Sequence, residues 1–311
     1  MTSIGIDFGG TTVKSAIVRD GQITARGDII DTQLYRGPEG ILDALIGVIT
    51  SLRAQDSAIA AIGIGVPGLV DSVNGIVHEM TNVAGWLEVP LRAILQERTG
   101  LPATIENDAK AMAYGEWKHG AAKNGRHVIC LTLGTGVGAG LILDGRLYRG
   151  AQLGAGEIGH TSIDYRGRRG VYGNLGCLEK YVGNGAIAER AAERYTAAGI
   201  PRAPAQCTPL DLAKAAENGD EIARQLWDDV GVELGTALAS AVWLLNPDTI
   251  VMGGGVAKAG ELIFAPVRRT IESATIKVIH ENLRIVPAAL GNDAGIVGNA
   301  VLALEAAGLA A

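Results

Sequence analysis

The chain has 311 residues, of which 48% are apolar and 19% charged, a composition typical of a folded globular protein. Because a single hydrophobic core stops growing near ~250–300 residues, this length predicts two lobes. The net charge of −6 argues against a general nucleic-acid or anionic-membrane binder, so neither is expected as a partner. Three cysteines form no disulfide framework, and the N-terminus lacks the basic region of a signal peptide; we therefore expect a cytoplasmic protein.

The first part of the chain predicts strands and helices in alternation. Short strands are expected at 3–8, 13–18 and 23–30, and apolar residues at helical spacing follow Pro38. A buried strand is then expected at 59–66, a helix at 91–98 and a strand at 103–106. This alternation favours an α/β lobe.

The pattern restarts past Gly120 and repeats the order of the N-terminus. Each copy has a strand, a glycine and threonine turn, a second strand and an Asp-Gly turn. The turns are Gly9-Gly10-Thr11 and Asp20-Gly21 in the first copy, and Gly134-Thr135-Gly136 and Asp144-Gly145 in the second. We interpret this as an internal duplication with one copy per lobe, and chance similarity of two hairpins is the alternative.

Residues 186–246 are predicted to be mostly helical. Helices are expected after Thr208-Pro209, at 221–245 and at roughly 293–307, and a strand at 249–252 leads into three glycines. We expect short hinges near 115–120 and 290. The smaller lobe would then hold residues 1–117 and 291–311, and the larger lobe residues 118–290.

The glycine turns are candidates for phosphate binding. The stretch from Gly9 to Lys14 matches part of a P-loop, but Val13 replaces its second glycine and a strand follows where a P-loop needs a helix. A hairpin whose backbone N–H groups and threonine hydroxyls reach a phosphate fits better, with Asp7 placed to orient a hydrated Mg²⁺. An ordinary tight hairpin is the alternative. The turns at 134–136 and 253–255 would complete a nucleotide site.

Four polar residues are candidates for ligand binding or catalysis. Asp108 follows a strand end, where ligands gather in α/β sheets; a general base and a helix N-cap are both possible roles. Glu157 and His160 are three residues apart among glycines, which favours a polar-ligand site over a core histidine. Glu179 is either a further ligand group or a solvated acid at a helix start.

Taken together, these residues resemble the ROK family of sugar kinases, and within it the bacterial glucokinases. The resemblance covers nearly the whole chain. It rests on Asp7-Phe8-Gly9-Gly10-Thr11, Glu106-Asn107-Asp108-Ala109, Leu133-Gly134-Thr135-Gly136-Val137-Gly138, Gly156-Glu157-Ile158-Gly159-His160, Gly176-Cys177-Leu178-Glu179 and Gly253-Gly254-Gly255-Val256. It implies an α/β, two-lobe, actin-like (ribonuclease H-like) ATPase fold with the active site in the interlobe cleft, and a homodimer.

The resemblance also implies an activity, namely ATP- and Mg²⁺-dependent phosphorylation of a hexose, in the first place glucose to glucose 6-phosphate. Asp108 would be the general base, and its carboxylate, with an ordinary pKa near ~4, is expected to accept the hydroxyl proton late. The implied sugar-binding residues are Asn82, Asn107, Asp108, Glu157, His160 and Glu179. The implied nucleotide- and phosphate-binding residues are Asp7, Gly9, Gly10, Thr11, Lys14, Gly134, Thr135, Gly136, Gly253, Gly254 and Gly255.

The chain departs from the family at one site. Many members bind a structural zinc through a histidine and a C-x-C-G-x-x-G-C run, and here Gly170 and Tyr172 replace the first two cysteines. Only His160 and Cys177 remain of the four ligands that a tetrahedral site needs, so we expect no structural zinc. The loop would instead be held by packing, with Tyr172 as a candidate contact. Arg166, Arg168 and Arg169 before it are expected to form a solvated basic turn.

Three alternatives to a glucokinase remain open. The acceptor could be fructose, mannose or an N-acetylhexosamine, and the donor could be inorganic polyphosphate. A non-catalytic, sugar-sensing regulator is the alternative from another class, because the family includes repressors with an N-terminal helix-turn-helix. Only six residues precede Asp7 and its hairpin, so no such DNA-binding domain is expected.

Overall fold

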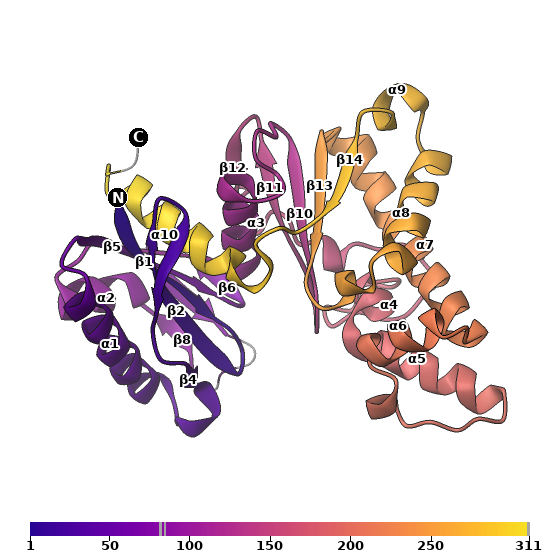
Figure 1. Ribbon diagram of the computed structural model, residues 1–311, viewed down its shortest axis with the longest axis horizontal. Coiled ribbons are helices and arrows are strands. Elements are labelled where there is room, and N and C mark those ends of the chain that lie inside the picture. The colour runs from indigo at the N-terminus through magenta and orange to yellow at the C-terminus, as the bar shows by residue number, and fades with distance from the viewer. Residues whose placement is uncertain (81–82, 84, 310–311) are drawn as a thin grey trace.

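The computed structural model describes residues 1–80, 83 and 85–309, which form two α/β lobes (Figure 1). The strands are β1 (Thr2–Phe8), β2 (Thr12–Arg19), β3 (Gln22–Arg26), β4 (Ile30–Asp31), β5 (Ile59–Val66), β6 (Leu69–Asp71), β7 (Ile76–Glu79), β8 (Leu87–Val89), β9 (Ala103–Asn107), β10 (Val128–Leu133), β11 (Val137–Leu143), β12 (Arg146–Tyr148), β13 (Thr249–Gly253) and β14 (Arg284–Pro287). The helices are α1 (Pro38–Gln55), α2 (Leu91–Thr99), α3 (Asp108–His119), α4 (Glu179–Val182), α5 (Asn184–Ala197), α6 (Pro209–Glu217), α7 (Glu221–Leu245), α8 (Glu261–Ala274), α9 (Lys277–His280) and α10 (Ala294–Ala306).

The two main sheets have the same topology. Their strand orders are β3-β2-β1-β5-β9 and β12-β11-β10-β13-β14, with two antiparallel pairs followed by two parallel pairs in each. The Asp-Gly turns also agree, since Asp20 and Asp144 have φ of 51° and 56° and each glycine after them is left-handed too. Both are therefore two-residue hairpin turns of the type that such sequences favour. The predicted duplication of one unit per lobe is confirmed.

Several helix ends follow from local sequence as predicted. Thr208 caps α6 by accepting a hydrogen bond from the Asp211 N–H, and Pro209 takes the first helical position. The helix α7 spans the predicted 221–245 and ends at Asn246, whose φ is 43°. The final helix α10 lies within the predicted 293–307.

The sequence analysis missed the three-stranded sheet β6-β7-β8 and the edge strand β14. The first three are short, and Leu69 and Leu87 point outward, so no alternation of apolar residues marks them. The run predicted at 23–30 is two strands, β3 and β4, both paired with β2.

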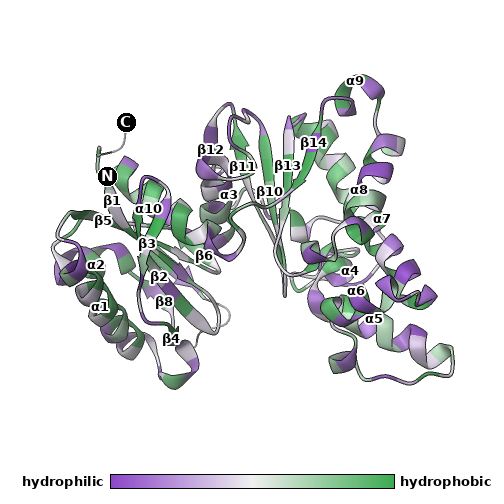
Figure 2. Cartoon of the chain, viewed as in Figure 1, coloured by the Kyte–Doolittle hydropathy of each residue, from purple (hydrophilic) through white to green (hydrophobic). Residues whose placement is uncertain are grey.

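The C-terminal helix α10 lies on the N-terminal lobe, where it covers β1 and β5 (Figure 1). Its residues 294–300 are all buried, and Figure 2 shows the helix largely in the colour of hydrophobic residues. Close packing here requires glycine, because a Cβ on Gly5 or Gly63 would collide with the backbone carbonyls of Ile296 and Asn299. The helix α3 packs between α10 and strands β10 and β11, so it contacts both lobes.

Both chain connections between the lobes meet at Glu116, a fully buried residue of α3. Its Oε2 accepts hydrogen bonds from the N–H groups of Ala121 at 2.8 Å and Ala289 at 3.0 Å, and its Oε1 accepts one from Leu290 at 2.7 Å. One carboxylate thus joins the connection after α3 to the connection before α10. The lobe boundaries predicted from the sequence, 1–117 with 291–311 against 118–290, remain a proposal.

We predict that Glu116→Ala lowers the free energy of unfolding by about 3 kcal/mol or more, because it leaves three backbone N–H groups without an acceptor. Urea denaturation of the variant and the wild type would measure the difference. Glu189→Ala, at an exposed position of α5, is the matched control and should change stability by less than about 0.5 kcal/mol. Equal losses in the two variants would contradict the role given to Glu116.

Candidate active site

A cavity of about 700 Å³ lies between the lobes. Five of the residues predicted to bind sugar line it together, although they come from three separate parts of the chain: Asn107, Asp108, Glu157, His160 and Glu179. The turn residues Gly10, Gly134, Thr135 and Gly136 form another part of its wall. Asn82, the sixth predicted residue, lies outside the described residues.

A smaller cavity of about 240 Å³ adjoins the first. Its lining includes Asp7, Gly9, Lys14, Gly253 and Gly254, all predicted for the nucleotide and its phosphates. Asp108, Ala109 and Thr132 line both cavities. The carboxylate of Asp108 therefore stands where the two spaces meet.

The tips of the duplicated hairpins face each other across the lobes. Thr11 and Thr135, one from each lobe, line a third cavity of about 700 Å³, which shares Gly10 and Thr135 with the first. Gly255 lines none of these three spaces. The predicted glycine turns at 9–11 and 134–136 thus lie at the same cavities. The third turn, at 253–255, contributes Gly253 and Gly254 to the smaller cavity.

Asp108 begins α3 directly after β9. Asn107 is the N-cap residue, with its Oδ1 accepting from the Lys110 N–H at 3.2 Å, so the N-cap alternative for Asp108 was wrong. The carboxylate of Asp108 does not cap the helix, and among the described residues its one donor is the adjacent Ala109 N–H, at 2.8 Å. Burial raises the pKa of Asp108 to about 6, against the lowering effect of that hydrogen bond, and the charges of Asp7 and Glu157 raise it further. This carboxyl group is a stronger base than the ordinary aspartate assumed from the sequence.

Asp7 and Lys14 are direct neighbours on the paired strands β1 and β2. Burial raises the pKa of Asp7, and the charge of Lys14 partly opposes that shift. Asp7 and Asp108 both face the smaller cavity, and each carboxylate is disfavoured there by burial. A hard divalent cation prefers carboxylate oxygens and would relieve this cost, so the donor set fits Mg²⁺.

The loop after β12 brings three polar side chains to the opposite wall. His160 Nε2 lies 4.0 Å from Glu157 Oε2; Glu157 precedes a short 3₁₀ turn at Ile158–His160, and His160 is the last residue of that turn. Glu179 begins α4, and its Oε2 accepts the Val137 N–H at 3.2 Å. That bond ties an acid of the cavity wall to the second glycine hairpin.

His160 and its neighbours contact side chains and carbonyls of the same loop. The ring of Tyr172 meets the His160 ring edge-on with 4.9 Å between centroids, which confirms the predicted contact. Asn174 Nδ2 donates to the His160 carbonyl at 2.7 Å, and Cys177 Sγ donates to the Gly159 carbonyl at 3.1 Å. No group of three or more potential metal ligands occurs among residues 1–80, 83 and 85–309. The absence of zinc stays a prediction.

The matching family model, that of the ROK family, covers residues 3–306. This chain belongs to the ROK family. The glucokinase of Halalkalibacterium halodurans is 34% identical over 311 residues, covering 95% of this chain and 92% of the relative. The crystal structure of a ROK family glucokinase from Streptomyces griseus in complex with glucose and AMPPNP matches with a TM-score of 0.82 and 31% identity, covering 98% of this chain and 100% of that one. A xylose repressor of Bacillus spizizenii is 30% identical, covering 97% of this chain and 77% of the repressor.

These likenesses confirm the two-lobe, actin-like ATPase fold predicted from the sequence. They also show that the relatives of this ROK protein include both sugar kinases and transcription repressors. Among its described residues, every helix is too short or too polar to span a bilayer.

The cavity of this ROK protein has wall residues that sequence reasoning missed. Glu79 ends β7, and the segment Pro67–Leu69 joins β5 to β6; all of them line the larger interlobe space. Leu69 and Glu79 belong to the small sheet that no sequence pattern predicted, and Pro67 and Gly68 form the connection that leads into it. The one sequence feature that could have indicated a role in the site is the position of Pro67-Gly68, directly after a predicted buried strand.

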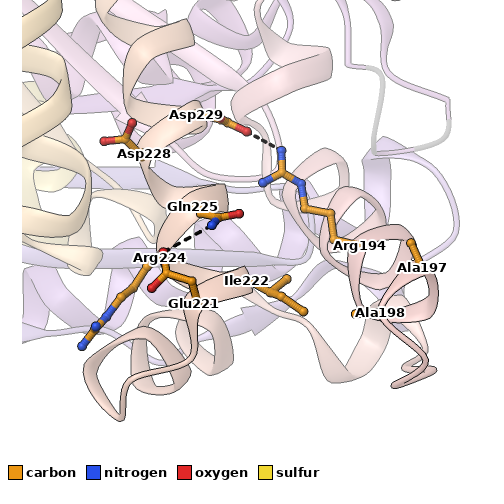
Figure 3. A pocket seen from close by; sticks show the side chains of 9 residues that line it. All are labelled: Arg194, Ala197, Ala198, Glu221, Ile222, Arg224, Gln225, Asp228 and Asp229. Atoms are coloured by element: carbon orange, nitrogen blue, oxygen red, sulfur yellow. Dashed lines mark hydrogen bonds and ion pairs between the residues drawn. The ribbon is translucent and has the colours of Figure 1, made fainter.

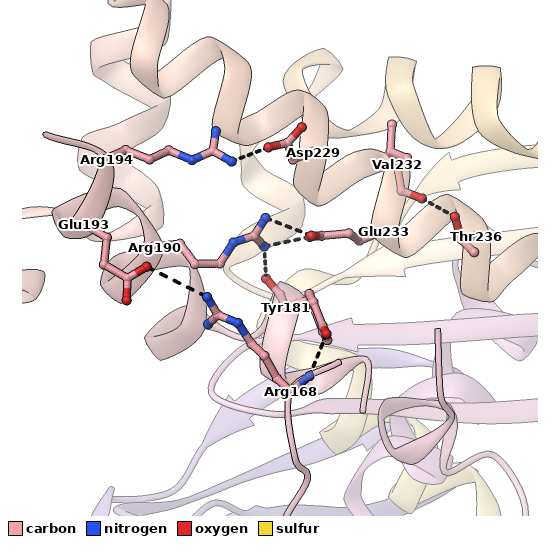
Figure 4. A network of polar contacts seen from close by, with 9 residues as sticks. All are labelled: Arg168, Tyr181, Arg190, Glu193, Arg194, Asp229, Val232, Glu233 and Thr236. Atoms are coloured by element: carbon pink, nitrogen blue, oxygen red, sulfur yellow. Dashed lines mark hydrogen bonds and ion pairs between the residues drawn. The ribbon is translucent and has the colours of Figure 1, made fainter. Parts of the chain in front are cut away.

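A further hollow, of about 920 Å³, lies away from the cleft on α5 and α7 (Figure 3). Its charged side chains have protein partners: Arg194 pairs with Asp229 across the hollow, and Asp228 pairs with Arg269. The neighbouring network in Figure 4 includes Arg168, which contacts Glu193 at 3.9 Å and lies over the Tyr181 ring. Arg168 thus belongs to a surface ion-pair network, as expected for a solvated basic turn.

We predict that Asp108→Asn stabilises this ROK protein above pH about 6. The folded state holds the proton of Asp108 more tightly than the unfolded chain, so the ionised carboxylate costs stability above that pH, and the cost disappears below the ordinary pKa of 3.8. Because the side chain is partly exposed, we expect a gain of only about 1–2 kcal/mol at pH 8. Urea denaturation at pH 8 and pH 5 would test this, and a gain of equal size at both would contradict it.

Proposed function

We propose that this ROK protein transfers the γ-phosphoryl group of ATP to a hexose, with glucose as the first candidate and glucose 6-phosphate as its product. The observation that carries the proposal is the position of Asp108 on the shared wall of two cavities. One cavity has the polar lining that suits sugar hydroxyls, and the other has the glycine-rich lining that suits phosphates. A carboxylate between them can take the proton of a hydroxyl that meets a phosphoryl group.

The polar residues of the larger cavity would bind the sugar. Asn107, Glu157, His160 and Glu179 would hydrogen-bond the hydroxyls and hold the acceptor oxygen beside Asp108. Buried groups matched to hydroxyls discriminate strongly, because an analogue that lacks one leaves its partner unpaired. The Streptomyces griseus relative, which was crystallised with glucose and AMPPNP, supports a sugar and a nucleotide as the two ligands.

The phosphate groups would lie against the hairpin tips. Backbone N–H groups of the hairpin tips at Gly10–Thr11 and Thr135–Gly136, with the two threonine hydroxyls, would bind them from both lobes, while the N–H groups of Gly9 and Gly134 close the hairpins. A magnesium ion bound near Asp7 would supply charge neutralisation for the phosphate oxygens. Because phosphoryl transfer proceeds in line, holding the two oxygens in position is the main contribution of the chain.

A coupled assay of ADP release across a panel of hexoses would test this proposal. Glucose, mannose, fructose, N-acetylglucosamine and N-acetylmannosamine are the informative acceptors, each measured with ATP and with inorganic polyphosphate. We expect turnover with ATP and the highest kcat/KM for glucose. Sugar binding by calorimetry without turnover on any acceptor would instead favour the regulator, the second candidate, which the repressor relatives support.

We predict that Asp108→Asn lowers kcat by at least ~10²-fold while the hexose still binds, because general bases contribute about that much. The amide keeps the oxygen that accepts the Ala109 N–H, so the backbone should be undisturbed. Asp144→Asn, at the exposed left-handed turn of the second hairpin, is the matched control and should retain full activity. Near-normal turnover of Asp108→Asn would exclude Asp108 as the base.

We predict an acid limb in the pH dependence of kcat/KM centred near pH 6. The base must be ionised to accept a proton. A pKa raised from 3.8 to about 6 therefore shifts the pH at which activity is lost upward by the same amount. Initial rates between pH 4.5 and 8.5, with the coupling enzymes checked separately, would show the limb. A single limb near pH 4 would mean that Asp108 titrates as an ordinary aspartate in the working enzyme.

The homodimer implied by the resemblance stays a prediction. Its test is sedimentation velocity of the purified protein.

A further inference from the structure

An ion pair between a buried glutamate and a partly exposed arginine joins the two lobes beside the candidate base. Glu106, the second-last residue of β9, is 4% exposed, and its Oε2 accepts a hydrogen bond at 2.7 Å from Nε of Arg149. Arg149 belongs to the other lobe, directly after β12. The second oxygen of the same carboxylate accepts the backbone N–H of Asn107 at 3.0 Å. Glu106 is thus held from both sides, two residues before Asp108.

Arg149 has a second contact, on the loop that leads to Glu157. Its backbone carbonyl accepts the Ala155 N–H at 2.9 Å, which closes the loop from 149 to 155. Glu157 follows Ala155 by two residues, and a Cβ on the intervening Gly156 would collide with the Ala139 carbonyl of β11. The position of Glu157 therefore depends on a loop that starts at Arg149.

We propose that Arg149 is a positioning residue that, through Glu106, keeps the Asn107–Asp108 turn of one lobe in register with the Glu157–His160 loop of the other. The proposal rests on the proposed function, because its purpose is to hold the acceptor between these two walls. Neither Glu106 nor Arg149 lines any of the three interlobe cavities, so the pair acts on the site through its neighbours.

The chemistry of the pair supports a role in geometry. A carboxylate as buried as Glu106 is costly without a partner, and guanidinium is the partner with the most directional hydrogen bonds. Small errors in the distance between a base and its substrate cost rate steeply, by about 10²-fold for 1 Å. Loss of the pair should therefore lower kcat even though no contact to the ligands is removed.

The test compares Arg149→Gln, Arg149→Lys, Glu106→Gln and the double variant Glu106→Gln/Arg149→Gln with the wild type. We expect Arg149→Gln to lower kcat about 10- to 100-fold and to raise the hexose KM, with the ATP KM changed less than about twofold. Arg149→Lys keeps the charge and should recover part of the loss. The double variant should be less impaired than the product of the single effects, because it leaves no unpaired buried charge. Arg126→Gln, which removes the exposed pair with Asp144, is the matched control and should be neutral.

Amide hydrogen exchange of the ligand-free protein tests the same link without any activity. In Arg149→Gln, exchange should rise about tenfold in both 106–111 and 150–158 and stay unchanged elsewhere. Faster exchange confined to 150–158, a uniform rise over the chain, or kcat within twofold of the wild type would overturn the proposal. A wild type without hexose-dependent turnover would refute the proposed function instead, and the exchange data would still decide whether Arg149 links the two walls.

Discussion

The burial of one carboxylate between two cavities is the constraint on which the rest of the site depends. Asp108 lies where a strand of one lobe becomes a helix that packs against the other, and neither lobe alone encloses it. Withdrawal from water costs stability, and the same withdrawal raises its pKa to about 6, so that it is a better proton acceptor near neutral pH. The other polar features of the cleft serve this position: Asn107 takes over the helix cap, which frees the Asp108 side chain, and Lys14 balances part of the charge of Asp7.

A two-lobe enzyme must place its groups accurately and still admit its ligands. The duplicated topology gives each lobe its own hydrophobic core, and a third apolar cluster of α3, α10, β10, β11 and β13 packs the lobes against each other. The connections between the lobes add polar contacts, with Glu116 at the hinges and Glu106 with Arg149 beside the site. Because hydrogen bonds are directional and hydrophobic contacts are not, these polar contacts add a restraint on orientation to the apolar packing at the lobe boundary.

Much of this arrangement could be predicted from the sequence, and the successes share a cause. Strands such as 59–66, the caps at Thr208 and Asn246, and the Asp-Gly hairpins are determined by residues close together in the chain. We could predict that Asp108, Glu157, His160 and Glu179 lie together because the order of motifs in the sequence is typical of the family. The sheet β6-β7-β8, with Glu79, was missed because its strands are short and half-exposed. The pair of Glu106 with Arg149 and the bonds of Glu116 were missed because they join distant residues, and charge alone does not indicate a partner.

The loop that carries His160 has several contacts of its own. Tyr172, Asn174 and Cys177 each supply a contact at or next to the histidine. If the predicted absence of zinc holds, these contacts would have to restrain a loop that four bonds to a metal fix in a zinc site. Weak contacts restrain a loop only when its ends are already held. One end is held by Arg149 through Ala155 and Glu106, and the other by Glu179 through Val137. Glu179 lines the larger cavity itself, and Arg149 binds Glu106, the neighbour of the wall residue Asn107, so the restraint on His160 depends on the integrity of the site itself.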